Sequence, residues 1–336
     1  MKFLKNLFLA TNILKKKRTF LFLAGLISTF FVSSEKAHAS YSATACDTLS
    51  LPTTLGTGDH TTLNKLNPIG GEEYGCTISP NSYIVKAHEV GICNADSNPF
   101  SLTALDTSGC AVIWSSNSGE LAELVSLQGS PAVYPLSDED LNEKPPVGTY
   151  KYGYIIIDDS IQIKATLNLK DAQGNITETW HTTDGDLEYT NTNRDEGYNA
   201  SLGKKTGEAE LVPTRFGYFY NTSGAKVCSA AGFPLTDGST ISALLLNSDK
   251  KTRSTITDTT NNFSQATKYC AGATYIGGVQ TFDTPLEITE ATSSFTLSFD
   301  TTNSGAHVSA HNYDGKTPEN RPYFDVGPFI IRMSVR

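Results

Sequence analysis

Four kinds of sequence pattern are missing from this 336-residue chain, and each absence weighs against a class of function. Beyond residue 39 no apolar run approaches the roughly 20 residues that a membrane-spanning helix needs, so we expect no span in the mature chain. The cysteines form no C-x-x-C pair, which leaves a thiolate zinc site or a thioredoxin-like redox site without support. G-x-S-x-G and glycine-rich phosphate-binding motifs are also missing. The sequence therefore predicts a protein that is not an enzyme and holds no cofactor.

Positive charge is scarce, and most of it lies near the start of the chain. The formal net charge is −9, from 26 Lys and Arg against 35 Asp and Glu. Residues 1–39 carry seven of the basic residues and one acid, so the remainder has 19 basic and 34 acidic residues, a net charge near −15. Phosphate backbones and anionic membrane surfaces repel such a chain, so nucleic acid is not expected as a partner.

Residues 1–39 have the pattern of a secretory signal peptide. Lys15, Lys16, Lys17 and Arg18 close a positive region, and the apolar run "TFLFLAGLISTFFV" follows. Ala37-His38-Ala39 is an A-x-A site, which predicts cleavage between Ala39 and Ser40. The segment could instead be kept as an N-terminal anchor. In either case the protein is expected to be exported and to be extracellular, at the cell surface or periplasmic.

All six cysteines lie beyond the predicted cleavage site, and an even number after a secretory signal favours disulfides. Six cysteines allow 15 pairings, among which sequence alone does not choose. Proximity along the chain favours the pairs Cys46–Cys76, Cys93–Cys110 and Cys228–Cys270.

The distribution of cysteines and turn residues predicts an all-β, antiparallel, β-sandwich-like fold in two domains. The polar segment "SDEDLNEKPPVG" places a boundary near residue 145. Residues 40–145 hold four cysteines and are predicted to form a loop-rich β domain, with strands at "SYIVKAHEV" and "CAVIWSS" and a short helix at "GELAELVSLQ". Residues 146–336 are predicted to form the sandwich-like domain, because strand-like segments alternate there with turn signals such as "TDGS" and "TNSG".

The clearest strand pattern is "IQIKATLNL", in which apolar and polar residues alternate over nine positions. Its apolar face is formed by Ile161, Ile163, Ala165, Leu167 and Leu169. The Asp158-Asp159-Ser160 segment before it has short side chains that bond nearby backbone groups in turns. We therefore interpret these carboxylates as the turn of a hairpin rather than as a catalytic pair.

Three clusters of side chains are weaker site candidates. Asp184, Asp186 and Glu188 alternate and could offer oxygen ligands to calcium, although the loop lacks the glycine of a helix–loop–helix calcium site. His307 and His311 have a zinc-like spacing, but on a strand they would lie about 13 Å apart. Two aromatic rows could stack on sugar rings or pack across strands: Tyr150, Tyr152 and Tyr154, and Phe216, Tyr218 and Tyr220.

These patterns together predict an exported, non-enzymatic β protein, secreted or at the cell surface, with a structural or adhesive role. Its partner would be a surface protein, a glycan or a second copy of itself. Two alternatives stay open. One is a carbohydrate- or ligand-binding module that uses the tyrosine-rich strand faces. The other is an extracellular polysaccharide hydrolase, since two of the many acids could face each other across a cleft.

Overall fold

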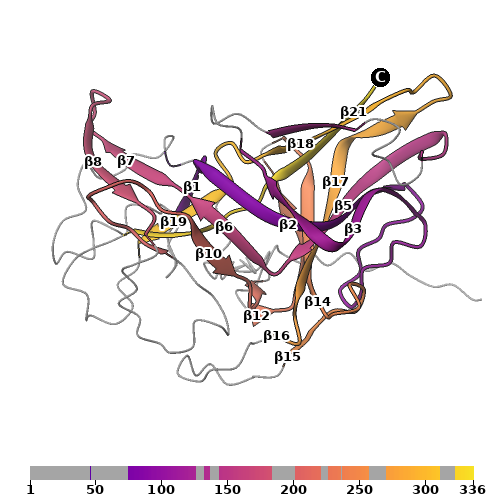
Figure 1. Cartoon of the computed structure of the whole chain (residues 1–336), viewed down its shortest axis with the longest axis horizontal. Helices are drawn as coiled ribbons and strands as arrows, with labels where there is room; N and C mark the ends of the chain where they lie inside the picture. The colour runs from indigo at the N-terminus through magenta and orange to yellow at the C-terminus, as the bar shows by residue number, and fades with distance from the viewer. Residues whose placement is uncertain are drawn as a thin grey trace, which may run out of the picture. The chain divides into compact units, whose positions relative to one another are not determined.

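The computed structural model describes residues 46, 75–125, 132–136, 144–183, 201–220, 226–235, 237–256, 270–310 and 322–336. All of them belong to one compact unit, Lys36–Arg336. None of the described residues lies in an α-helix, and every strand pairing among them is antiparallel. The predicted all-β, antiparallel fold is confirmed (Figure 1). Among the residues that the structure describes, no helix is long and apolar enough to cross a membrane.

The described chain forms 21 strands. In order they are β1 (Gly75–Ile78), β2 (Ser82–Asn94), β3 (Cys110–Glu123), β4 (Ala132–Leu136), β5 (Gly148–Asp158), β6 (Ser160–Lys164), β7 (Thr166–Lys170), β8 (Ile176–His181), β9 (Ser201–Leu202), β10 (Val212–Arg215), β11 (Phe219–Tyr220), β12 (Lys226–Val227), β13 (Ser229–Pro234), β14 (Thr240–Leu246), β15 (Thr255–Ile256), β16 (Cys270–Ala271), β17 (Tyr275–Ile288), β18 (Phe295–Asp300), β19 (Ala306–Ala310), β20 (Pro322–Val326) and β21 (Ile330–Val335).

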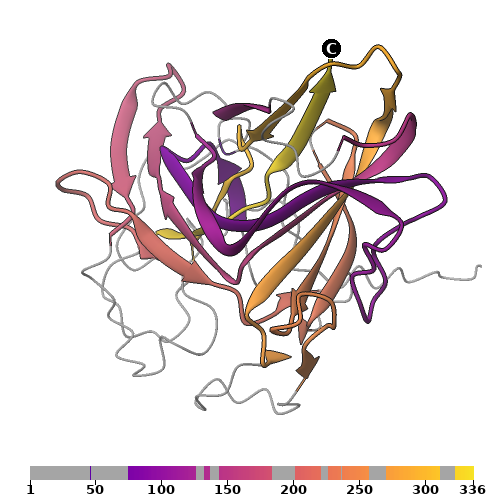
Figure 2. The same cartoon turned by 45° about the vertical axis from the view of Figure 1, so that its right-hand side comes forward.

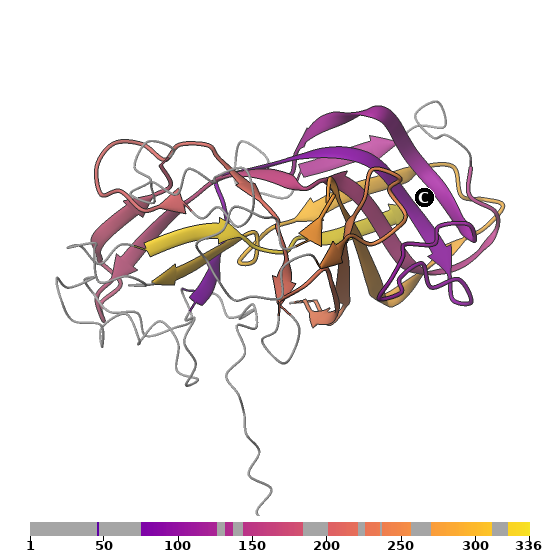
Figure 3. The same ribbon diagram turned by 90° about the horizontal axis from the view of Figure 1, so that it is seen from below.

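The central element is an eight-stranded sheet in the order β10-β6-β2-β5-β17-β14-β13, with β3 paired to β2 outside this path. Strands β14 and β17 lie side by side in register from Thr240 to Leu246 (Figure 2). A four-stranded sheet, β1-β19-β20-β9, and a three-stranded sheet, β21-β18-β4, complete the larger elements. The β7–β8 hairpin lies at the opposite end of the fold from β14 and β17 (Figure 3).

The main core fills the space between one face of the eight-stranded sheet and the two smaller sheets. Alternation in the central strands turns residues such as Val85, Ile155 and Ile163 toward this space. Phe299 of β18 and Phe324 of β20 pack there from the smaller sheets. A second cluster, which includes Tyr154 and Leu246, covers the opposite face of the central strands. The sheet is therefore buried on both faces at its centre, which gives the sandwich-like packing.

Strands from both sides of residue 145 share the central sheet. β2 pairs with β5 from Ala87 to Asn94 and with β6 from Ser82 to Ile84. The predicted boundary near residue 145 does not separate two sheets, because β2 and β3 have no sheet of their own. Apolar residues of β2 enter the same core cluster as those of β5 and β6.

The segment "GELAELVSLQ" is not the predicted helix over its described part. Residues 119–123 continue β3, which pairs with β2 through Ala87↔Glu120 and Ile84↔Glu123. A helix former such as Leu121 therefore takes an extended conformation, because the neighbouring strand supplies backbone hydrogen bonds that outweigh local propensity. Residues 126–128 lie outside the described part of the chain.

The predicted hairpin at Asp158-Asp159-Ser160 is also wrong. β5 and β6 do not pair with each other; both run along β2 in the same direction, one after the other (Figure 1). On their other edge the partner changes from β17 to β10. The backbone of Asp159 joins both partners, since its N–H donates to Thr274 O at 3.1 Å and its carbonyl accepts the Phe216 N–H at 2.8 Å. The central sheet therefore forks at Asp159.

Three disulfides join the six cysteines in the pairs that proximity favours, Cys46–Cys76, Cys93–Cys110 and Cys228–Cys270. The Cys93–Cys110 bridge links β2 to β3 at a directly paired position. Closing these loops restricts the unfolded chain, typically by about 2–4 kcal/mol for each bridge.

Candidate apolar binding pocket

A cavity of about 120 Å³ opens between the eight-stranded sheet and the segment that connects β20 to β21. Its floor is made by aliphatic side chains of the central strands, including Ile155, Ile157 and Ile276. The described side chains that line it are almost all apolar, and none of them is charged. An enclosure of this kind favours an apolar group, because water inside finds few hydrogen-bond partners.

Small residues on two paired strands create the space. Ala243 of β14 lies directly opposite Gly278 of β17, and both line the cavity. A methyl group added at Gly278 would meet Ile155 at 3.4 Å and Ile241 at 4.0 Å, both ordinary contacts. Glycine is therefore not required there by the backbone. The absence of a side chain at Gly278 leaves room on the face of the sheet that borders the cavity.

The fork of the sheet supplies one wall. Ile157 and Ile161 line the cavity on either side of Asp159, the residue at which the neighbouring strand changes from β17 to β10. Phe216 and Phe219 extend the wall from the chain that follows β10.

The fork wall is also tied to a disulfide. The Cys270 N–H donates to the Gly217 carbonyl at 3.1 Å, between the two phenylalanines of the wall. Cys270 is bonded to Cys228, whose carbonyl accepts the Leu245 N–H at 2.9 Å. The Cys228–Cys270 bridge thus fixes the aromatic wall to β14 of the central sheet.

The opposite wall is the segment from Val326 to Phe329. A Cβ atom at Gly327 would overlap the carbonyl oxygen of Ser304, so only glycine allows this approach. The Tyr83 hydroxyl donates to Gly327 O at 3.0 Å, and the Tyr83 ring meets Phe329 edge-on. Burial, with a smaller contribution from Asp325, raises the pKa of Tyr83 well above its usual range. The phenol therefore stays neutral and remains a hydrogen-bond donor to this wall.

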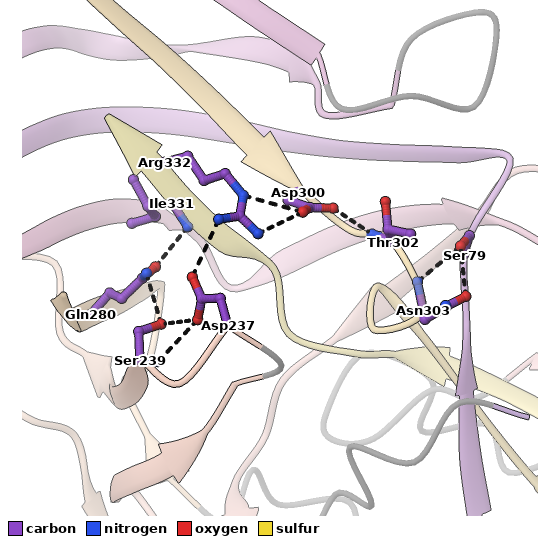
Figure 4. A network of polar contacts seen from close by, with 9 residues as sticks. All are labelled: Ser79, Asp237, Ser239, Gln280, Asp300, Thr302, Asn303, Ile331 and Arg332. Atoms are coloured by element: carbon purple, nitrogen blue, oxygen red, sulfur yellow. Dashed lines mark hydrogen bonds and ion pairs between the residues drawn. The ribbon is translucent and has the colours of Figure 1, made fainter. Parts of the chain in front are cut away.

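A polar network outside the cavity holds the strand that follows this wall (Figure 4). Gln280 of β17 is 1% exposed; its Oε1 accepts the Ile331 N–H at 2.6 Å, and its Nε2 donates to Ser239 Oγ at 3.0 Å. Arg332 donates to Asp300 at 3.0 Å and lies 3.5 Å from Asp237. These contacts tie β21 to β17, to β18 and to the turn between β13 and β14.

The charge of Asp300 is maintained by its hydrogen bonds. Burial raises the pKa of Asp300, but the bonds from Thr302 and Arg332 outweigh it, and the pKa is lowered overall. Asp300 therefore accepts hydrogen bonds as a carboxylate at neutral pH, which keeps the Arg332 side chain in place beside β18.

Three hydroxyl groups belong to the described residues that line the cavity. Tyr83 donates to Gly327 O, and Thr77 Oγ1 donates to Asn303 O at 2.6 Å. Ser304 is 4% exposed, and its Oγ has no hydrogen-bond partner among the described residues. A buried hydroxyl without a partner costs roughly 1–3 kcal/mol. Ser304 is the polar group at this cavity that a bound molecule could satisfy.

The two aspartates at the fork differ in burial, since Asp159 is buried whereas the Asp158 side chain is partly exposed. His88 lies in a β-bulge of β2 and is 4% exposed; its Nε2 lies 2.7 Å from Asp158 Oδ1. The His88 Nδ1 lies 3.2 Å from Nζ of Lys250. Lys250 has a left-handed backbone conformation, with φ of 61°. Because an ammonium group only donates, Nδ1 accepts and the Nε2–H donates to Asp158. Asp158 thus holds the bulge, and His88 was not among the residues that the sequence singled out.

The first aromatic row is buried, which favours packing over sugar stacking, the two alternatives that the sequence left open. Tyr152 and Tyr154 lie in one core cluster, and Tyr150 lies in another with Ile92 and Phe295. The Tyr154 hydroxyl donates to Glu89 Oε1 at 2.7 Å, and the Tyr150 hydroxyl donates to Pro146 O at 2.8 Å. Burial, with help from Glu89, raises the pKa of Tyr154. These phenols are occupied inside the protein.

The second aromatic row does not share a strand face. β10 ends at Arg215 and β11 comprises only Phe219–Tyr220, so Phe216 and Tyr218 lie between strands. Phe216 lines the cavity and is half-buried, as is Tyr218. Phe216, for which the sequence left both sugar stacking and cross-strand packing open, forms part of an apolar wall.

The other predicted site residues are only partly described. Asp184, Asp186, Glu188, His311 and the cleavage pair Ala39 and Ser40 lie outside the described residues. His307 lies on β19 opposite Asp325 of β20, and burial lowers the pKa of His307 to about 4. Within the described part of the chain, no group of three or more His, Cys, Asp or Glu side chains could hold a metal ion.

Sequence reasoning missed the cavity because its parts are far apart along the chain. One local signal was present: Gly277-Gly278 interrupts the strand-like run "YIGGVQ", and glycine inside a strand often marks a close approach or a binding position. Ser304 lies in the turn signal "TNSG", and serine is common in turns, so it does not stand out there. Nothing local to that turn indicates that Val326–Phe329 packs against it.

No family model matches the chain, and comparison with curated proteins and with solved structures finds no similar protein.

Proposed function

We propose that this chain is an exported, non-enzymatic binding protein that works outside the cytoplasm and receives an apolar group in the cavity at the fork of its central sheet. Three disulfides support an oxidising compartment. The signal-like residues 1–39 support export. The adhesive role that the sequence favours then takes a specific form, in which the protein holds a partner by an apolar group that enters the cavity.

The observation that carries this proposal is the cavity itself. Well-packed interiors leave few voids larger than a water molecule. Here about 120 Å³ remains open beside paired small residues, Ala243 and Gly278, although a methyl group at Gly278 would fit without strain. Filling the space would add dispersion contacts at no backbone cost, so the fold alone does not explain it.

The test is a binding titration with small apolar probes and a variant that fills the cavity. Toluene is added to the purified protein with its disulfides intact, and amide chemical shifts are followed by NMR. We expect saturable shifts centred on β14, β17 and the segment 326–329. Gly278→Ala places a methyl group in the cavity and is expected to weaken toluene binding at least about fivefold, since it takes up part of the volume that a ring needs.

Gly148→Ala is the matched control. Gly148 lies at the start of β5, away from the cavity, and a Cβ there would meet only Tyr150, at 4.0 Å. This variant is expected to bind toluene as the wild type does. Toluene shifts that do not saturate, or that stay the same in Gly278→Ala, would contradict the proposed function.

A further inference from the structure

We infer that the cavity selects an uncharged, ring-sized apolar group that carries one hydrogen-bonding atom, and that Ser304 is the residue that recognises that atom. This inference rests on the proposed function and names the ligand class for the same cavity. An aromatic or aliphatic alcohol, or an amide on a small apolar body, has the required chemistry.

The size of the ligand follows from the volume. An engineered apolar cavity of about 150 Å³ in another protein accepts benzene. The cavity here has about 120 Å³ and is partly open. It therefore holds one six-membered ring or a short branched alkyl group, with the rest of a larger molecule left outside.

The neutral character of the ligand follows from the lining. None of the described residues that line the cavity carries a charge, and a charged group buried without a partner costs far more than the cavity can return. The nearby network of Arg332, Asp237 and Asp300 is internally paired and does not line the cavity. A carboxylate or ammonium group on the inserted part is thereby disfavoured.

The hydrogen-bonding atom follows from Ser304. The hydroxyls of Tyr83 and Thr77 already donate to backbone carbonyls, whereas Ser304 Oγ has no partner among the described residues. Ser304 Oγ is buried, and rotation about the Cα–Cβ bond gives three staggered positions for it. A ligand oxygen in the cavity accepts a hydrogen bond from the Ser304 hydroxyl when the hydroxyl takes the staggered position that faces the cavity.

The test compares two ligands of nearly the same shape, phenol and toluene, which differ by a hydroxyl in place of a methyl group. Each is titrated by NMR into the wild type and into Ser304→Ala, and the ratio of the toluene Kd to the phenol Kd is taken for each protein. The preference of phenol for water is common to both proteins and cancels between the two ratios. One hydrogen bond of about 0.5–1.5 kcal/mol predicts that this ratio falls about two- to tenfold in Ser304→Ala.

Ser254→Ala is the control, because Ser254 is also fully buried but does not line the cavity, and its Oγ donates to Ala271 O at 2.5 Å. Its ratio is expected to equal that of the wild type. If Ser304→Ala does not fold, Ser304→Gly removes the same hydroxyl. A ratio that changes less than twofold in the Ser304 variant, with both ligands binding, overturns the role of Ser304 and leaves the apolar cavity standing. Absence of binding by either ligand overturns the proposed function itself.

Discussion

Replacing Gln280 by leucine tests whether the polar network of Figure 4 holds β21 against the central sheet. Leucine is similar in size to glutamine but has no hydrogen-bonding atoms. The Ile331 N–H, which donates to Gln280 Oε1 at 2.6 Å, loses its partner. Ser239 Oγ loses the Nε2 donor at 3.0 Å but keeps its own bond to Asp237.

The expected cost follows from these two bonds. An intramolecular hydrogen bond contributes about 1 kcal/mol net, and a buried backbone N–H left without a partner adds about 1–3 kcal/mol. The apolar side chain recovers part of this by burial. We therefore expect the free energy of unfolding to fall by about 2–4 kcal/mol.

Urea unfolding, followed by fluorescence with disulfides intact, measures this change. Gln173→Leu is the control, because Gln173 is exposed in the turn between β7 and β8, and a surface change of this kind shifts stability by no more than about 0.5 kcal/mol. A loss below 1 kcal/mol for Gln280→Leu would refute the reasoning, since it would mean that β21 is held without this network.

Two further predictions concern other parts of the core. Because burial lowers the pKa of His307 to about 4 from an ordinary 6.5, the unfolded chain binds this proton first as the pH falls. The contribution of neutral His307 to the free energy of unfolding is thus complete above pH 6.5, and up to about 3 kcal/mol of it is lost as the pH falls toward 4. In His307→Gln the urea midpoint should therefore change less with pH over that window. A midpoint that changes with pH as steeply as in the wild type would contradict this prediction. Ile163 is fully buried on β6, which pairs with β2 and β10. Ile163→Asp should therefore lower the free energy of unfolding by at least about 4 kcal/mol and unfold the whole described unit, whereas Gln162→Asp on the other face should not. A folded Ile163→Asp variant would show that this face of β6 is not part of the core.

Strand existence could be predicted from the sequence because it is a local property. The alternation in "IQIKATLNL" correctly places Ile161, Ile163 and Leu167 in the core. The pairing of that segment could not be predicted, because the Asp158-Asp159-Ser160 signal suits a bulge or a fork as well as a turn. Which of these forms depends on β2 and β17, and β17 comes more than 100 residues later.

The candidate site was harder to predict than the strands. Its proposed recognising hydroxyl, Ser304, and its wall at Val326–Phe329 become a site only because the fold brings them to the same cavity as Ile155 and Gly278. The cysteine pairs were simpler, because each pair is close in the sequence and proximity alone favoured the observed pairing. The burial of Tyr150, Tyr152 and Tyr154 also follows from sheet order, because other strands bring apolar side chains over both faces of β5.

The place of β17 in the sheet has a consequence for the order of folding. β17 lies between β5 and β14, yet it is made of residues Tyr275–Ile288, near the end of the chain. Until that segment is available, β5 has one open edge and the β13–β14 hairpin has no sheet to join. Pairings of such sequence separation slow folding, because a long loop must close before the contacts form. A chain that emerges from its N-terminus therefore keeps this edge of β5 unpaired until residues 275–288 have appeared.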